Sequence, residues 1–337
     1  MHYLITGHTG FKGSWLSLML AQRGHSVSGI SLQPDVGSIF ERAELSKLIN
    51  NDIRCDIRES TKLTSYFREL RPDVVIHLAA QALVRESYNN PVKTFETNVM
   101  GTLNVIKASQ QVNTIQAQLI VTTDKVYKNI GKTLGYIETD ALGGQDPYSA
   151  SKAMADIATQ SWLASFANPP SAIARAGNVI GGGDICEDRL IPDLINSYTS
   201  GITPKLRFPN SVRPWQHVLD CLNGYLRLVD AIIENKVGGA WNFGPDGNQS
   251  NTVADVANIA GAVWGPQKSW ESDLGNHPHE AALLMLNSDK ARTELGWCDK
   301  LSFEESVKWT IDWYKNVHNG NDPLEETLKN IKSFEGK

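Results

Sequence analysis

Tyr3-Leu4-Ile5-Thr6 runs directly into Gly7-His8-Thr9-Gly10-Phe11-Lys12-Gly13, and the helix-forming stretch Ser14-Trp15-Leu16-Ser17-Leu18-Met19-Leu20 follows at once. A strand, a glycine-rich turn and a helix in this order present backbone N–H groups and the positive end of a helix to a pyrophosphate. Gly7 allows the tight turn, Gly10 lets the backbone approach a phosphate, and Gly13 lets the helix pack on the strand. The spacing is G-x-x-G-x-x-G, a weak signal in isolation that stands here where the geometry requires it. We therefore predict a dinucleotide-binding turn formed by Gly7, Thr9, Gly10, Phe11, Lys12 and Gly13.

The composition excludes several classes of protein. Of the 337 residues, 41% are hydrophobic and 20% are charged, which is typical of a folded globular chain. The net charge of −5 gives no reason to expect nucleic acid as a partner, and no apolar run approaches the roughly 20 residues that span a bilayer. The four cysteines, Cys55, Cys186, Cys221 and Cys298, lack metal-site spacing, so we predict reduced thiols and no metal. Because the first strand begins at the start of the chain, no secretory signal is expected and a cytoplasmic location follows.

Apolar strands alternate with amphipathic helices through the first half of the chain. This alternation predicts an α/β fold, a Rossmann-type doubly wound parallel sheet with helices on both faces. We predict strands at 3–6, 27–30, 52–55, 74–78, 118–122 and 172–175. We predict helices at about 11–23, 59–70, 92–111 and 148–166.

The pattern changes after Gly181-Gly182-Gly183, where short strands mix with helices. This predicts a smaller C-terminal α+β substrate lobe with strands at 206–208, 215–218 and 241–243 and helices near 190–199, 219–234, 252–263 and 302–316. We divide the chain approximately into a dinucleotide-binding domain (1–180), the substrate lobe (181–317) and a charged peripheral tail (318–337) with a surface helix at 324–334. The chain is expected to cross between the two lobes.

Tyr148 and Lys152 lie four residues apart, which places both on one face of a predicted helix. A nearby ammonium favours the phenolate and is expected to lower the pKa of Tyr148 towards neutral pH. Such a tyrosine can take a proton from a substrate hydroxyl while a hydride leaves the same carbon. His77, inside a buried strand, is expected to serve the sheet core, and His8 has no assigned role.

Together these residues resemble the extended short-chain dehydrogenase/reductase superfamily over about 1–317. The resemblance is carried by Gly7-x-x-Gly10-x-x-Gly13, Asp56-Ile57, His77-Leu78-Ala79-Ala80, Asn98-x-x-Gly101-Thr102 and Tyr148-x-x-x-Lys152. It implies that Asp56 binds the adenine amine and that Lys152 holds the nicotinamide ribose as well as assisting Tyr148. It also implies a cofactor site that includes Ile57, Leu78, Ala79, Ala80, Asn98, Thr122, Tyr148 and Lys152.

The choice between NAD and NADP is made after the second strand, where NADP needs a cation for its 2′-phosphate. The stretch here is Ser31-Leu32-Gln33-Pro34-Asp35, which contains no Lys or Arg. The acid that usually binds the ribose of NAD is missing from the strand end, since Asp35 lies a few residues late. We predict NAD.

Thr123-Asp124-Lys125 follows the fifth predicted strand. An epimerase or reductase of this superfamily needs only a Ser or Thr there, whereas an added Asp and Lys supply a second acid and base. Two extra proton-transfer groups are useful if water must be eliminated. A solvated loop charge pair is the alternative explanation.

Longer stretches are similar to the CDP-glucose 4,6-dehydratase family. They are 7–16, Thr122-Thr123-Asp124-Lys125-Val126-Tyr127, 143–149, 175–184, 187–193 and Arg213-Pro214-Trp215-Gln216-His217-Val218. The resemblance implies a lyase of deoxysugar (lipopolysaccharide O-antigen) biosynthesis that makes CDP-4-keto-6-deoxyglucose. Thr123 would polarise the C4 oxygen, Asp124 would protonate the departing 6-OH, and Lys125 would take the C5 proton, although related dehydratases have Glu there. Ile185-Cys186 and Lys128 depart from the usual pattern and affect only the expected substrate contacts.

The same resemblance implies the partners. CDP-glucose would be held in the substrate lobe by fork-shaped arginine donors and amides, for which the candidates are Gln81, Asn178, Arg189, Arg207, Arg213 and His217. The family usually forms homodimers through helices corresponding to 92–111 and 148–166, with Ile106, Trp162 and Phe166 as candidate contacts.

Three alternatives stay open at this point. A nucleotide-sugar 4-epimerase or reductase of the same fold would release no water. The same elimination could act on a UDP-, dTDP- or GDP-sugar, since only the resemblance indicates cytidine. A non-catalytic NAD-binding regulator would typically lack Tyr148 or Lys152, and both are present.

Overall fold

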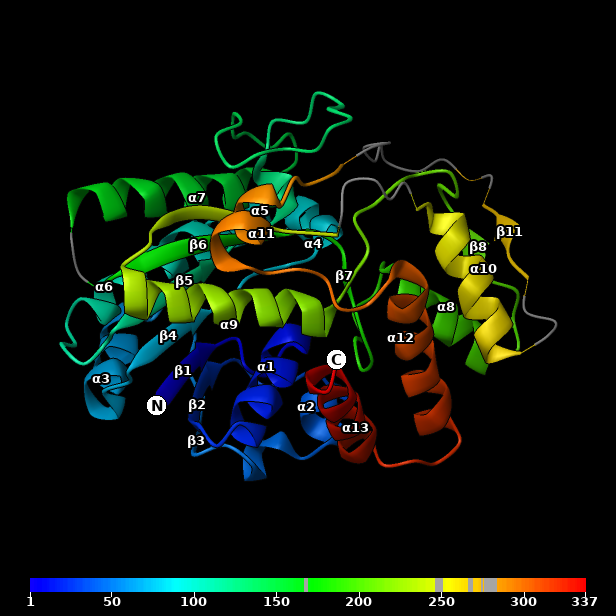
Figure 1. Cartoon of the computed structure of the whole chain (residues 1–337), viewed down its shortest axis with the longest axis horizontal. Helices are drawn as coiled ribbons and strands as arrows, with labels where there is room; N and C mark the ends of the chain where they lie inside the picture. The colour runs from blue at the N-terminus through cyan, green and yellow to red at the C-terminus, as the bar shows by residue number, and fades with distance from the viewer. Residues whose placement is uncertain (167–168, 246–250, 266–268, 274, 276–283) are drawn as a thin grey trace.

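The computed structural model describes residues 1–166, 169–245, 251–265, 269–273, 275 and 284–337 (Figure 1). Seven parallel strands of this described chain form one sheet in the order β10-β6-β5-β4-β1-β2-β3. The strands are β1 (His2–Thr6), β2 (Ser26–Ser31), β3 (Asn51–Arg54), β4 (Val74–His77), β5 (Ala117–Val121), β6 (Ser171–Ala176) and β10 (Gly239–Phe243). The predicted doubly wound sheet and its first six strands are confirmed.

The strand order reverses at β1, which pairs with β2 on one side and with β4 on the other. In an open parallel sheet, the crevice beyond the carboxyl ends of the strands at such a reversal is the usual ligand site. The glycine-rich turn leaves the sheet at this point, since it follows β1 directly.

Each face of the sheet has its own apolar core. Tyr3 and Ile5 belong to the core shared with α1 (Phe11–Gln22) and α9 (Val218–Asn235). Leu4 points to the other core, which is covered by α3 (Ser60–Leu70) and α6 (Thr102–Ser109). Successive strand residues face opposite sides, so a strand covered twice is apolar throughout.

The helix predicted at 92–111 is not continuous. The chain forms α5 (Pro91–Phe95), a π-helical segment η2 (Glu96–Gly101) and then α6. A Cβ at Gly101 would lie 2.5 Å from Cδ1 of Ile57 in the loop after β3, so only glycine lets η2 pack this closely on that loop. Such π-helical turns are frequent at functional sites, and this one carries Asn98.

The smaller lobe lies beyond one end of the sheet (Figure 1). It contains α8 (Leu190–Thr199), α10 (Val253–Trp264), α12 (Phe303–His318) and the strand pairs β7 (Val179–Ile180) with β9 (Gln216–His217) and β8 (Lys205–Leu206) with β11 (Glu271–Ser272). The placement of the strand at 241–243 in this lobe was wrong, because β10 pairs with β6 of the main sheet. α9 likewise packs on β5 and β6, and α11 (Asp289–Leu295) contacts β10. The chain therefore returns to the sheet after residue 217, and the division into lobes with a boundary at residue 180 stays a prediction.

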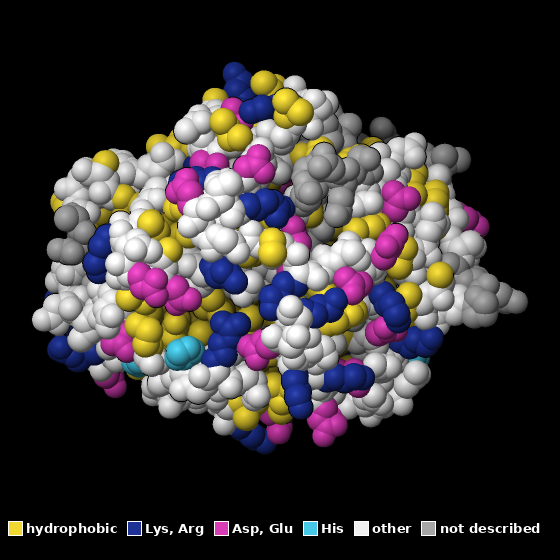
Figure 2. Space-filling model, in the orientation of Figure 1, with side chains coloured by type: hydrophobic (Ala, Val, Ile, Leu, Met, Phe, Trp, Pro, Cys, Tyr) yellow, Lys and Arg dark blue, Asp and Glu magenta, His cyan; other side chains and the backbone are white. Residues whose placement is uncertain are grey.

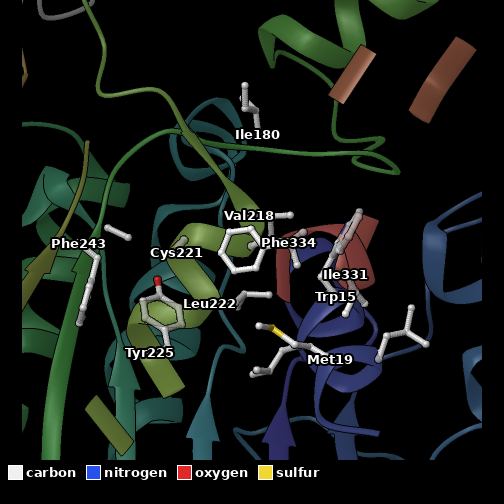
Figure 3. Packing of buried hydrophobic residues seen from close by; sticks show 14 of the residues in the cluster. Trp15, Met19, Ile180, Val218, Cys221, Leu222, Tyr225, Phe243, Ile331 and Phe334 are labelled. Atoms are coloured by element: carbon white, nitrogen blue, oxygen red, sulfur yellow. The ribbon is translucent and has the colours of Figure 1, made fainter. Parts of the chain in front are cut away.

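The last segment forms the predicted helix, α13 (Pro323–Glu335), but it is more than a peripheral tail. Ile331 and Phe334 are each 1% exposed and join the core beside Trp15 and Met19 of α1 (Figure 3). The helix also carries many charged residues, but its buried apolar side chains hold the segment against the sheet domain.

The remaining elements are the long helix α7 (Pro147–Ser165) and the short α2 (Ile39–Arg42), η1 (Leu45–Lys47), α4 (Val84–Asn89) and η3 (Asp124–Val126). Among the described residues, no helix is long and apolar enough to cross a membrane. Lys/Arg and Asp/Glu side chains are interspersed over the face shown in Figure 2.

Candidate active site

The three glycines of the first turn have different surroundings. Gly7 has a φ of +80°, and a Cβ there would lie 2.6 Å from the backbone nitrogen of Ala79. A Cβ at Gly13 would lie 2.1 Å from the carbonyl oxygen of Gly7, so both positions require glycine for the fold itself. A Cβ at Gly10 would meet only the Gly7 oxygen at 3.4 Å, and Gly10 is exposed at the N-terminus of α1. Gly10 therefore leaves its open side to a ligand, which fits a dinucleotide pyrophosphate.

Gly10→Ala and Gly13→Ala are expected to have opposite consequences. Gly10→Ala keeps the fold and weakens binding of the dinucleotide about 10-fold or more, because the added methyl occupies the phosphate approach. Gly13→Ala lowers the thermal unfolding temperature, because its methyl collides with the turn. Calorimetric titration with NAD and thermal melts of both variants check this; a Gly10→Ala protein with unchanged affinity would contradict it.

The other residues of the turn hold it in place. The hydroxyls of Thr9 and Ser31 lie 2.7 Å apart and join the turn to the end of β2. The ring of Phe11 packs against the apolar core, and Nζ of Lys12 donates to the hydroxyl of Tyr225 at 3.3 Å. The unassigned His8 is buried, with Nε2 2.7 Å from Oδ1 of Asp52.

The predicted cofactor residues beyond the turn lie at the carboxyl ends of β3 and β4. Asp56 is bound by the guanidinium of Arg58 at 2.7 Å, and this hydrogen bonding holds the pKa of the Asp56 carboxyl below its usual range. Ile57 is buried, while Leu78, Ala79 and Ala80 are half-buried. Asn98 is buried and braces the loop after β4: its side chain accepts from the backbone of Gln81 at 2.8 Å and donates to the hydroxyl of Ser151 at 2.8 Å.

The segment after β2 contains no cation, but the fold brings one to it. Arg54 of β3 is in register with Ser31 of β2. Its guanidinium donates to Asp52 at 2.6 Å, so the positive charge is already paired. The sequence could not indicate this neighbour, because the two residues meet only through strand pairing.

The five predicted catalytic residues come together at the carboxyl end of β5 and the start of α7. Thr123 donates to Oδ1 of Asp124 at 2.9 Å, and its side chain favours the ionised form of Tyr148. Nζ of Lys125 lies 5.8 Å from the centre of the Tyr148 ring. Lys152, one turn further along α7, donates to the carbonyl oxygen of Val121 at 3.0 Å. Thr, Asp, Lys and Tyr side chains therefore share one small volume.

Burial is the largest influence on the pKa values of Tyr148, Lys152 and Asp124. It raises the pKa of Tyr148 to about 12 and lowers the pKa of Lys152 to about 8. The predicted lowering of the Tyr148 pKa is therefore wrong for this structure, because the loss of hydration on burial outweighs the effects of Thr123 and Arg189 that favour the phenolate. Burial also raises the pKa of Asp124, whose Oδ2 has no hydrogen-bond partner among the described residues. A carboxyl in that state can donate a proton.

Two of the predicted substrate-binding arginines affect the pKa values of the cluster through their positive charge. The positive charge of Arg189 favours the ionised form of Tyr148, and that of Arg213 favours the ionised form of Asp124. Arg189 also donates to Asp184 at 2.8 Å. Arg207 lies further out, 3.6 Å from Asp188.

The amide candidates differ. Asn178 is half-buried after β6. The side chain of Gln81 is already hydrogen-bonded within the protein, since Nε2 donates to the carbonyl oxygen of Leu83 and to the hydroxyl of Thr94 at 3.0 Å each. Thr122 also points away from the cluster, donating to Asp156 at 3.0 Å.

His217 cannot touch a substrate, so that prediction was wrong. Its ring is 0% exposed and packs edge-on between Trp15 and Trp309, at 6.1 and 6.0 Å between ring centres. Nδ1 accepts from the backbone N–H of Leu219 at 3.2 Å and caps α9. Burial lowers the pKa of His217 to about 3, as it does for His77, which bonds Thr6 and Thr102 inside the sheet as expected.

These buried neutral histidines are expected to weaken the fold in acid. A histidine whose folded pKa is depressed contributes stability above its unfolded pKa and loses it as pH falls towards the folded pKa. His217→Asn retains an acceptor that can cap α9 but removes the titrating ring. Between about pH 7 and about pH 5, the free energy of unfolding should therefore fall by about 2 kcal/mol less in this variant than in the parent protein. Urea unfolding at both pH values measures it, and equal drops in the two proteins would contradict it.

One contact between the two lobes was not predicted. Arg85 of α4 pairs with Asp188 at 2.8 Å, joining the loop after β4 to the segment before α8. No metal site was predicted; among the described residues, no group of three or more His, Cys, Asp or Glu side chains could hold a metal ion.

Comparison with known proteins agrees with this geometry. The family model described as GDP-mannose 4,6 dehydratase matches residues 4–310. A Salmonella typhimurium protein named CDP-glucose 4,6-dehydratase is 41% identical, covering 98% of this chain and 95% of its own length. A Bacillus anthracis dTDP-glucose 4,6-dehydratase, solved in complex with NAD, superposes with a TM-score of 0.81 at 24% identity, covering 96% of this chain and 99% of that one. A Thermus thermophilus UDP-glucose 4-epimerase, also solved with NAD, superposes with a TM-score of 0.80 at 24% identity, covering 94% and 100%.

Proposed function

Because the chain belongs to the GDP-mannose 4,6-dehydratase family, we propose that it is an NAD-dependent lyase that converts CDP-glucose into CDP-4-keto-6-deoxyglucose and water. The observation that carries this proposal is the buried cluster of Thr123, Asp124, Lys125 and Tyr148. It contains one more acid and one more base than oxidation of a hydroxyl requires. The 41% identity to the Salmonella typhimurium protein supports cytidine as the base.

NAD fits the residues of the first turn. The absence of a side chain at Gly10 leaves room for a phosphate beside the turn. Arg54, which is in register with the end of β2, is already paired with Asp52. The turn 7–13 would hold the pyrophosphate, and Asp56 and Lys152 would hold the two ends of the molecule. Bound NAD supplies a temporary acceptor for the C4 hydride, which it later returns to C6.

The side chains account for the proton transfers. Tyr148 takes the proton of the 4-OH in its phenolate form, which Thr123 and the charge of Arg189 favour against the effect of burial, and the hydroxyl of Thr123 orients the C4 oxygen. The resulting ketone acidifies the C5 proton, which Lys125 removes. Asp124, whose pKa is raised by burial, donates a proton to the departing 6-OH, so that water leaves. Lys125 then returns a proton to C5 as C6 is reduced, so C5 keeps a hydrogen and the net redox change is zero.

Arg189 and Arg213 would bind the diphosphate. Both already influence the cluster electrostatically, and guanidinium groups match phosphate oxygens in geometry. Asn178, half-buried beyond β6, is the remaining amide donor. Arg207 would contact the outer part of the nucleotide.

A direct assay tests the function. The purified protein is incubated with NAD and with CDP-, UDP-, dTDP- or GDP-glucose, and the 4-keto product is detected by its absorbance in alkali. We expect the ketone with CDP-glucose and a solvent deuteron at C5 when the reaction runs in heavy water. Formation of the C4 epimer without ketone would show a 4-epimerase instead, and preference for another base would reassign the substrate.

The structure supports a homodimer through α5, η2 and α7. These elements pack against one another and expose apolar side chains: Val92 is 70% exposed, Met100 53%, Met154 49% and Ile157 51%. Phe166, 50% exposed, packs on Trp162 at 5.0 Å. Ile106 is 1% exposed and belongs to the core, so its proposed contact was wrong. A patch of this kind marks a protein interface.

Ile157→Asp is expected to convert the dimer to a monomer, because it buries a charge in that interface. Light scattering after size-exclusion chromatography measures the mass. Ile202→Asp, at an isoleucine 63% exposed outside these helices, is the matched control and should leave the mass unchanged. A parent protein already monomeric at working concentration would contradict the proposal.

The four cysteines are all free thiols, which fits the proposed cytoplasmic location.

A further inference from the structure

Arg175 is a charged residue in the interior of the sheet. It lies in β6, between β5 and β10, and its side chain is 1% exposed. Interior strands of parallel sheets are covered on both faces and are normally apolar. Since apolar residues can often replace a buried ion pair without loss of stability, stability alone does not explain its presence.

Arg175 is bound to α7 in a two-pronged pair. Nε donates to Oδ2 of Asp156 at 2.9 Å, and Nη2 donates to Oδ1 at 2.8 Å. Asp156 is also 0% exposed. It lies four residues after Lys152 and eight after Tyr148, on the same face of the helix. The pair thus fixes the catalytic face of α7 against β6.

The same pair holds both ends of the segment 123–126. At one end, the hydroxyl of Thr122 donates to Oδ2 of Asp156 at 3.0 Å. At the other end, the hydroxyl of Tyr127 accepts from Nη1 of Arg175 at 2.8 Å and donates to Asn242 of β10 at 2.7 Å. The segment between these two anchors carries Thr123, Asp124 and Lys125.

We propose that Asp156 and Arg175 are positioning residues that hold the segment 123–126 in place against Tyr148 and Lys152 for the elimination step. This inference rests on the proposed dehydration. Oxidation at C4 uses Tyr148, which α7 carries itself, and takes only Thr123 from the segment. Elimination depends on Asp124 and Lys125, which must reach C6 and C5 of the same ring from a different element. A displacement of about 1 Å can lower a rate about 100-fold, so loosening the anchors slows elimination more than oxidation.

Tyr127→Phe tests the second anchor, because it removes one hydroxyl from the network and leaves the ring. We expect kcat to fall roughly 10- to 100-fold with little change in KM. In single turnovers, reduced nicotinamide should accumulate before product appears, because oxidation outpaces elimination. Tyr136→Phe is the matched control: its ring stacks on Tyr127, but its hydroxyl bonds Asn129 and Ile130 outside the network.

Thr122→Val tests the first anchor in the same way. Its matched control is Thr159→Val, also buried, whose hydroxyl donates only to the carbonyl oxygen of Ala155 within α7. Thr122→Val should accumulate reduced nicotinamide, and Thr159→Val should not. NAD affinity is measured for both variants, because a lower kcat that is restored by excess NAD would assign Thr122 to cofactor binding and overturn the proposal for this anchor.

The outcomes separate this inference from the proposed function. If the parent protein forms no ketone from any of the four nucleotide sugars, the proposed function fails. If the parent is active but Tyr127→Phe and Thr122→Val match their controls, the positioning role is overturned. Equal slowing of oxidation and elimination would also overturn it, since a purely structural defect lowers the amount of active protein and affects every step alike.

Discussion

Tyr148→Phe should lower kcat for CDP-glucose by about 10²- to 10⁴-fold while leaving the affinity for CDP-glucose nearly unchanged. The phenol is the only group of the cluster that the mechanism requires for removal of the 4-OH proton. Tyr148 is 9% exposed, so water cannot readily replace the lost hydroxyl. No later step can begin, because the C5 proton becomes acidic only after C4 is oxidised.

The measurement is the reduction of bound NAD in a single turnover together with ketone formation, and both should fall by the same factor. Tyr66→Phe, in α3 on the far core of the sheet, is a matched control that should keep full activity. Substantial oxidation by Tyr148→Phe would remove this tyrosine from the role of base.

Asp124→Asn should separate the two halves of the reaction. The amide cannot donate a proton to the leaving 6-OH, so elimination is expected to fall about 10²- to 10⁴-fold. Oxidation at C4 should continue, because Tyr148 and Thr123 are intact, and reduced nicotinamide should build up. Asp124 is 2% exposed and burial raises its pKa, a shift that favours the protonated form needed by a general acid.

Asp230→Asn is the control for this change, because burial also raises the pKa of Asp230, which lies in α9 away from the cluster. It should behave like the parent. Lys125→Ala completes the comparison: if it retains the full elimination rate, the base at C5 is another group. An Asp124→Asn protein that forms ketone at the parent rate would exclude Asp124 as the acid.

The local elements of the fold were predictable because their determinants are close together in the chain. The turn at 7–13 combines short-range steric needs with a strand before it and a helix after it. The strands at 74–78 and 118–122 are recognisable as apolar runs, since a strand covered on both faces has no polar side. The spacing of Tyr148 and Lys152 follows from the period of one helical turn.

The assignments that failed depended on contacts between distant residues. The strand at 241–243 was placed in the smaller lobe because it follows that lobe in the chain, whereas it pairs with β6. His217 was assigned to the substrate site because it lies four residues after Arg213 in the chain. In the folded protein, the rings of Trp15 and Trp309 pack against it. Helix periodicity at 92–111 could not reveal the π-helical segment η2, whose Gly101 lies against the distant Ile57.

The sequence by itself determined the parallel sheet, the dinucleotide turn and the residue types of the catalytic cluster, because glycine sterics, hydrophobic period and helical spacing act within a few residues. Only the tertiary structure decided how those groups are protonated and held. Burial sets the pKa of Tyr148 and Asp124, and the Asp156–Arg175 pair ties two elements far apart in the chain. Both effects arise from packing, which removes water from groups whose sequence neighbours give no sign of it.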